Sequence, residues 1–154
     1  MSGYTWNADE FAALLLQSYF PERTQRESAI IRDYLREHLG EFERVDFSVR
    51  VGQGMTPEPG LLPAVARNVI DSSKLRVDVV GYRGSGATLV EAKTHISREV
   101  FGQLLAARHL WLEDHPDAPE PRLVAIGRTV NADALRVFAA NGVDVYVYPD
   151  ESAV

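Results

Sequence analysis

Two acidic residues and a lysine lie in neighbouring stretches that are rich in Val, Leu and Thr. Asp78 belongs to the stretch 75–82, and Glu91 and Lys93 belong to the stretch 87–93. The Arg-Gly-Ser-Gly between them can close as a two-residue turn with a glycine at the position that requires a positive φ. The sequence therefore predicts a β-hairpin whose two strands carry these three side chains.

The turn also fixes which residues face each other. If Arg83 faces Gly86, Asp78 lies directly opposite Glu91, and strand alternation turns Glu91 and Lys93 to the same face. Like charges opposite each other on a sheet repel, so two facing carboxylates favour a cation between them. Two carboxylate oxygens and a backbone carbonyl are a partial ligand set for Mg²⁺, completed by water and a phosphate oxygen. We expect a buried lysine beside them to act on one of these waters.

Asp78, followed by the Glu-Ala-Lys of 91–93, resembles the signature of the PD-(D/E)XK nuclease superfamily. Val77 stands where many members have a proline. The resemblance extends over 24–148 in the order of elements and implies an αβββαβ core with the restriction-endonuclease-like fold. It also implies a Mg²⁺-dependent nuclease, with Mn²⁺ as a substitute, that cleaves DNA and leaves a 5′-phosphate.

The resemblance assigns roles to the residues of the motif. Asp78, Glu91 and the backbone carbonyl of Ala92 would hold the metal ion, and Lys93 would position the attacking water. A helical acid ahead of the sheet often completes such a site, which would be Glu27 here. The residues themselves leave an alternative, because Thr24 to Glu27 also fits a capping box in which the glutamate reaches back to a backbone N–H.

Further candidates follow the motif. The resemblance implies that Gln103, in the helix after Lys93, lies near the lysine and holds a water or a phosphate. The alternative is a glutamine that faces solvent. His95, Arg98 and Arg108 are candidate phosphate contacts, and the arginines are preferred over the histidine.

Composition bounds the function. A chain of 154 residues with 45% hydrophobic and 25% charged residues is typical of one soluble globular domain. The net charge of −6 and the pI near 5.2 argue against tight nonspecific binding to nucleic acid, which depends on cations that neutralise phosphates. A local basic rim with a bound metal would overcome this in a small nuclease.

Two observations concern the compartment. The chain has no cysteine, which excludes disulfides and thiolate zinc sites and fits a reducing compartment. The apolar run 11–16 is too short to span a bilayer, and Asp9 and Glu10 stand where a signal peptide would be positive. We therefore expect a cytoplasmic protein with no membrane segment.

The periodicity predicts an α/β fold with a mixed central sheet flanked by helices. We expect a single domain over 1–154, with a helical extension at 1–20, a nuclease-like core at 22–148 and a frayed tail at 149–154. The core is extended by a C-terminal αβ unit. Strands are expected at 43–51, 75–82, 87–93, 122–127 and 143–148, and helices at 7–19, 22–38, 63–70, 97–115 and 131–142.

Three alternatives stay open. The apolar face of the first helix can pack on the core or form a homodimer contact. The loop 52–62 is either a flap over the substrate or a disordered connection. The competing function is a catalytically inactive module of the same fold that binds protein or nucleic acid, which the acidic pI favours and the retained Asp78, Glu91 and Lys93 oppose.

Overall fold

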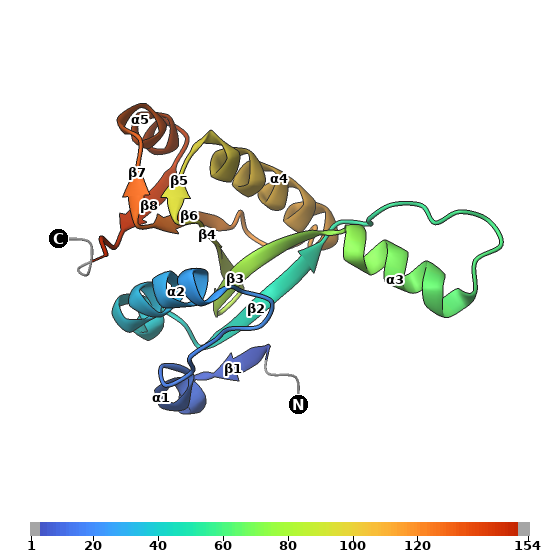
Figure 1. Ribbon diagram of the computed structural model, residues 1–154, viewed down its shortest axis with the longest axis horizontal. Coiled ribbons are helices and arrows are strands. Elements are labelled where there is room, and N and C mark those ends of the chain that lie inside the picture. Colours follow the sequence, from blue (N-terminus) through green and yellow to red (C-terminus); the bar gives the residue numbers. More distant parts are fainter. Residues whose placement is uncertain (1–3, 151–154) are drawn as a thin grey trace.

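The computed structural model describes residues 4–150 as a six-stranded mixed sheet with helices on both faces (Figure 1). The strands are β1 (Thr5–Asn7), β2 (Arg44–Val51), β3 (Leu75–Arg83), β4 (Gly86–Ala92), β5 (His95–Ile96), β6 (Arg122–Gly127), β7 (Thr129–Val130) and β8 (Val143–Val147). The α-helices are α1 (Phe11–Leu14), α2 (Gln25–His38), α3 (Pro63–Ser73), α4 (Arg98–Asp114) and α5 (Ala132–Ala140), and short 3-10 helices cover Ala8–Glu10 and Leu39–Glu41.

The order of the strands across the sheet is β1-β2-β3-β4-β6-β8. Neighbours from β1 to β4 are antiparallel, and β4, β6 and β8 are parallel to one another. The succession α2-β2-β3-β4-α4-β6 is the αβββαβ core that the sequence predicted, and α5 with β8 forms the predicted C-terminal αβ unit. The α/β fold class is confirmed.

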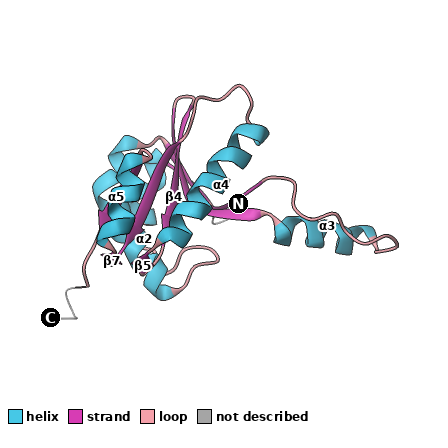
Figure 2. Cartoon of the chain, turned by 90° about the horizontal axis from the view of Figure 1, so that it is seen from above, coloured by secondary structure: helices cyan, strands magenta, loops and turns pink. Residues whose placement is uncertain are grey.

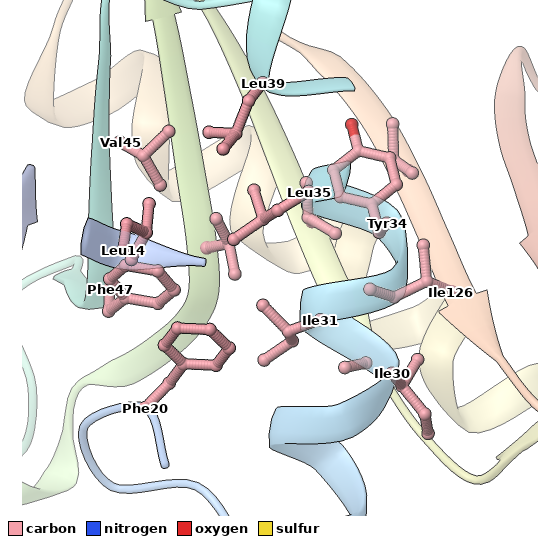
Figure 3. Close-up of a cluster of buried hydrophobic side chains, with 14 of the residues drawn as sticks. Leu14, Phe20, Ile30, Ile31, Tyr34, Leu35, Leu39, Val45, Phe47 and Ile126 are labelled. Carbon is pink, nitrogen blue, oxygen red and sulfur yellow. The ribbon is translucent and has the colours of Figure 1, made fainter. Parts of the chain in front are cut away.

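Two hydrophobic clusters hold the helices on the sheet. Ile30, Ile31 and Leu35 of α2 pack against Phe47 and other buried side chains on one face (Figure 3). On the other face, α4 presents the buried stripe Val100, Leu104, Ala107 and Trp111, as its periodicity predicted. Burial of apolar surface on both faces fixes the helices that border the site described below.

The central hairpin has the predicted register. Val79 pairs with Val90, and Arg83 pairs with Gly86 across the turn, where Gly84 has a φ of 55°. The pairing of β3 with β4 stops at Val79 and Val90. Beyond this point β3 stays paired with β2 as far as Leu75, while β4 stays paired with β6, so the sheet forks.

Strand β2 changes face at the level of the fork. Val45 and Phe47 pack in the cluster under α2, whereas Val49 and Val51 pack in the cluster under α4. The expectation that 43–51 turns all of its odd-numbered residues to one face was therefore wrong. The reason is the backbone at Ser48, which has a φ of 53° and interrupts the alternation of side chains.

The N-terminal helix predicted at 7–19 begins where predicted but is shorter. Asn7 is its N-cap, and the Asn7 N–H donates to Oε2 of Glu10 at 2.8 Å. The 3-10 helix Ala8–Glu10 then runs into α1, which ends at the buried Leu14. Strand β1, which precedes this helix and pairs with the open edge of β2, was not predicted. The predicted tail 149–154 lies largely outside the described residues, which end at 150.

Helix α3 and the loop 52–62 project from the body beyond the ends of β2 and β3 (Figures 1 and 2). The helix buries none of its side chains completely. Within the described chain, no helix has the length and apolar character needed to cross a membrane.

Candidate active site

A cavity of about 520 Å³ lies at the fork of the sheet. Strands β3 and β4 contribute Asp78, Glu91 and Ala92, and Lys93 follows directly after β4. The remaining lining residues come from α2 and the turn before it, from β2, from the end of α3, from the start of β3 and from α4, namely Arg23, Glu27, Arg50, Ser72, Lys74, Leu75, Arg76 and Gln103. The fold thus brings the three residues of the sequence motif to one cavity, together with Ala92, Glu27 and Gln103.

Asp78 is almost completely buried, with 2% of its surface exposed. Its Oδ2 accepts a hydrogen bond from the Ala92 N–H at 2.9 Å, so the carboxylate bridges the two strands where their ladder has ended. Its Oδ1 lies 2.5 Å from Nη1 of Arg23. Burial raises the pKa of Asp78, and Arg23 and the Ala92 N–H oppose that rise.

Glu91 is 5% exposed, and its Oε1 is buried with no hydrogen-bond partner. Burial, and then the adjacent Asp78, raise the pKa of Glu91 to about 9. A hydrogen bond between the two carboxyl groups favours keeping the proton on Glu91. Without a cation, the chain therefore resolves the repulsion between these acids by leaving Glu91 protonated at neutral pH.

Lys93 lines the cavity but is exposed, so the expectation of a buried lysine was wrong. Its backbone is held firmly, because its N–H donates to the carbonyl of Ile126 at 3.0 Å. A Cβ on Gly127 would lie 2.4 Å from the Lys93 carbonyl oxygen, so only glycine permits this close approach. The position of the lysine backbone depends on β6, whereas its ammonium group reaches solvent.

Glu27 makes the capping box that was one of the two predicted alternatives. Its Oε2 accepts from the Thr24 N–H at 3.1 Å, while the Thr24 hydroxyl accepts from the Glu27 N–H at 3.2 Å. The same carboxylate lies 3.9 Å from Arg23. Among residues 4–150, no three His, Cys, Asp or Glu side chains gather closely enough to hold a metal by themselves, so Glu27 does not complete a triad with the two buried acids.

The other predicted side chains divide into two groups. Gln103 lines the cavity. His95 and Arg98 border a different cavity beside α5, where His95 contacts the Thr129 hydroxyl. Arg108 lies 3.8 Å from Glu120 and does not line the cavity at the fork. The structure thus keeps Gln103 at the site and places the three predicted phosphate contacts elsewhere.

Four cations at the cavity were not predicted, namely Arg23, Arg50, Lys74 and Arg76. The spacing of Arg23 and Glu27 at i and i+4 is a weak signal that these two share a surface. Arg50 and Arg76 become neighbours only because β2 pairs with β3. A long loop and a helix separate these two strands in the sequence, so no turn fixes which of their residues face each other. These residues give an acidic chain a locally basic rim.

The residues at the fork fit a divalent cation. A buried carboxylate oxygen without a partner, on Glu91, faces a second buried carboxylate, on Asp78. The C=O and N–H of one strand residue point to the same side, so the Ala92 carbonyl is directed to the side of Asp78. Mg²⁺ is commonly held by only one or two carboxylates, with water and substrate phosphate as further ligands, so the absence of a third acid does not disfavour it.

The shift of Glu91 predicts an unusual pH dependence of stability. A carboxyl group whose pKa rises from 4.5 to about 9 on folding contributes stability that is complete below 4.5 and is lost as the pH rises through 9. In EDTA, we expect urea denaturation to show a loss of up to about 1.4 kcal/mol per pH unit from this group between pH 5 and 9. Glu91→Gln should remove the contribution of Glu91 to the dependence of the free energy of unfolding on pH.

Glu120, an exposed glutamate at 69% side-chain exposure, supplies the control. Glu120→Gln should keep the wild-type slope. Asp78 contacts Glu91 and also contributes to the slope, so the comparison measures the loss of the Glu91 carboxyl together with its effect on the pKa of Asp78. Equal slopes for wild type and Glu91→Gln would contradict the assignment of the proton to Glu91.

The order of the elements and the mixed sheet with flanking helices are consistent with a restriction-endonuclease-like α/β core. No family model matches the chain, and no curated protein sequence matches it.

Three solved structures are similar to this chain. One is the EndoMS-dsDNA2 complex, at 14% identity and a TM-score of 0.45, covering 86% of this chain and 48% of that one. A second is a repair endonuclease from Pyrococcus abyssi, at 12% identity and a TM-score of 0.46, covering 86% and 50%. A third is AF1548, a protein of unknown function, at 20% identity and a TM-score of 0.43, covering 79% and 57%. The chain thus spans about half the length of the structures it matches, and the functional proposal depends on the cavity itself.

Proposed function

We propose that this chain is a metal-dependent nuclease that hydrolyses phosphodiester bonds of DNA and leaves a 5′-phosphate. The observation that carries the proposal is the buried pair Asp78 and Glu91 at the fork, with an unpartnered oxygen on Glu91 and Lys93 beside it. A core built only for stability rarely buries two adjacent carboxyl groups. Their position in a cavity at the surface favours a functional explanation.

In this proposal each residue of the cavity has a defined role in the reaction. Asp78, Glu91 and the Ala92 carbonyl hold Mg²⁺, for which Mn²⁺ substitutes, and Glu91 gives up its proton when it does so. The ammonium of Lys93 positions the water for in-line attack, and Gln103 orients that water or a phosphate oxygen from α4. The metal, when bound, stabilises the negative charge that accumulates on the phosphate.

The competing proposal is a catalytically inactive module of the same fold. The contact that favours it is the 2.5 Å pair between Arg23 and Asp78, in which an arginine already supplies a positive charge to one of the acids. If that arginine is a permanent substitute for a metal ion, the cavity needs no divalent cation. The two proposals therefore differ in their response to Mg²⁺ and Mn²⁺.

A cleavage assay tests the proposal directly. The purified chain is incubated with end-labelled duplex, single-stranded, flapped and junction DNA in Mg²⁺ or Mn²⁺, with Glu91→Ala protein as control. We expect cleavage of at least one substrate by the wild type, none in EDTA, and none by the variant. A melting temperature that does not respond to either cation, together with no cleavage, would favour the inactive module, because a ligand of the native state raises that temperature.

A further inference from the structure

Two arginines face each other across β2 and β3 at the edge of the cavity. Arg50 is the direct partner of Arg76 in the antiparallel ladder, and both side chains line the cavity. Like charges directly opposite each other destabilise a sheet, so this pair favours an anion between or beside the two guanidinium groups. Each is about one-third exposed, at 32% and 33%, and is open to a ligand from solvent.

Glu22 is the anion that the ligand-free chain places there. Its Oε1 lies 3.4 Å from Nη2 of Arg50, and its Oε2 lies 3.4 Å from Nη1 of Arg76. Each carboxylate oxygen thus contacts one arginine. Glu22 has a φ of 58°, a left-handed conformation that costs energy for a residue with a Cβ.

The fit between Glu22 and the arginines is loose. Charge-assisted hydrogen bonds between a guanidinium and an oxyanion are usually about 2.7–2.9 Å long, so both contacts at 3.4 Å are long. The Nε of Arg76 is also buried without a hydrogen-bond partner. The two arginines therefore have hydrogen-bonding capacity that Glu22 does not use.

We propose that Arg50 and Arg76 form a clamp for a backbone phosphate of DNA, and that Glu22 occupies this clamp until DNA displaces it. The inference deepens the proposed nuclease function and rests on it. A phosphodiester offers two anionic oxygens in a geometry that a guanidinium fork binds well, as a carboxylate does. Because neighbouring phosphates contact the other cations of this rim at the same time, DNA is a polyvalent ligand and Glu22 is a monovalent one.

The clamp lies where it can hold DNA next to Asp78 and Glu91. Arg76 precedes Asp78 by two residues on β3, and both side chains line the same cavity. A phosphate held by Arg50 and Arg76 thus directs the adjoining strand of DNA across the fork, next to Asp78 and Glu91. The clamp also explains how a chain with a net charge of −6 can bind DNA at a defined place.

Binding of fluorescently labelled DNA in Ca²⁺, and separately in EDTA, tests the clamp without cleavage. We expect Arg50→Gln and Arg76→Gln each to weaken binding about tenfold and to reduce the slope of log affinity against log salt by about one. Glu22→Gln should bind DNA about threefold to tenfold more tightly, because the internal competitor is lost. Arg50→Lys and Arg76→Lys keep the charge without the fork and should fall between wild type and the glutamine variants.

Two matched variants control for charge alone. Arg44→Gln removes an arginine from the other end of β2, where it contacts Asp46, and should change affinity less than twofold, on the order expected for distant screened charges. Glu41→Gln removes one negative charge that contacts Arg122 and should not reproduce the gain of Glu22→Gln. Melting temperatures verify that every variant is folded.

The outcomes separate this inference from the nuclease proposal. Wild-type affinity in the Arg50 and Arg76 variants, or no gain in Glu22→Gln beyond that of Glu41→Gln, would overturn the clamp and leave the nuclease proposal standing. Binding that depends on both arginines, in a protein that cleaves nothing, would support the clamp and overturn the nuclease. Absence of DNA binding by the wild type in both conditions would overturn the two together.

Discussion

Lys93→Ala is expected to lower the rate of Mg²⁺-dependent DNA cleavage by about 10²–10⁴-fold, the range typical for loss of a group that positions or activates a reacting water. The side chain is exposed at the cavity, so the free energy of unfolding should stay within about 0.5 kcal/mol of the wild type. Single-turnover cleavage and urea denaturation of the same preparations measure the two quantities.

The chain supplies a close control for this variant. Its only other lysine, Lys74, lines the same cavity, but its ammonium lies 3.4 Å from Asp71 at the end of α3. Lys74→Ala removes the same charge and the same number of atoms, and we expect it to reduce cleavage less than about tenfold, as for a peripheral phosphate contact. Equal losses in the two variants would show that the cavity needs positive charge and not a lysine at position 93.

Arg23→Ala is expected to lower the free energy of unfolding in EDTA by about 3 kcal/mol at pH 8, because removal of one partner leaves a buried carboxylate uncompensated. The Arg23 and Asp78 side chains are only 8% and 3% exposed, so solvent screens the pair weakly. The pH matters, because Arg23 holds down a pKa of Asp78 that burial raises. At low pH, protonation of Asp78 would reduce the loss.

The same variant should respond more strongly to Mn²⁺ than the wild type does. On the proposed function, a cation at the fork would compete with Arg23 for Asp78, and Arg23→Ala would remove that competition. We expect a larger rise in melting temperature at saturating Mn²⁺ and tighter Mn²⁺ binding by calorimetry. Glu91→Gln in the Arg23→Ala background should abolish the response if both acids hold the ion.

Arg128 gives the matched comparison. Its Nη1 lies 2.7 Å from Asp33, with side-chain exposures of 19% and 30%, away from the cavity at the fork. Arg128→Ala should also destabilise the chain, but its rise in melting temperature with Mn²⁺ should be no larger than that of the wild type, because its cavity at the fork is unchanged. A Mn²⁺ response that is the same in the two variants would contradict competition between Arg23 and the metal.

The inactive-module alternative makes the opposite prediction for Arg23. If the arginine is a permanent structural cation, its loss destabilises the protein and no divalent ion compensates. The Arg23 experiment therefore distinguishes an arginine that a metal ion can displace from an arginine that permanently takes the place of the metal ion. It does so without any nucleic acid.

Local sequence pattern was sufficient for much of the core. The alternation of residues and the glycine-containing turn specify the hairpin and its register, and the helical spacing of α4 specifies which of its side chains are buried. The position of Asp78 opposite Glu91 follows from that register, because side-chain direction in a strand has a period of two. The Thr24 capping box is equally local.

Features that depend on segments distant in the sequence could not be predicted from local sequence pattern. Strand β1 exists because β2 offers an open edge, and the change of face at Ser48 accompanies a fork that only the sheet as a whole defines. His95 has the right parity for the site if β4 simply continues, but the chain leaves β4 after Ala92 and His95 joins a separate two-stranded sheet. Parity arguments fail wherever a strand ends.

By itself, the sequence determined the αβββαβ order and the two acids that face each other across a hairpin, because turn chemistry and strand alternation act over a few residues. Only the tertiary structure decided that Arg23 lies on Asp78, that Arg50 faces Arg76, and that Glu22 bridges those two arginines. These contacts join residues more than 25 positions apart, and their partners are set by the pairing of β2 with β3 and by the path of the chain into α2. No local pattern encodes which distant charge will compensate a buried one.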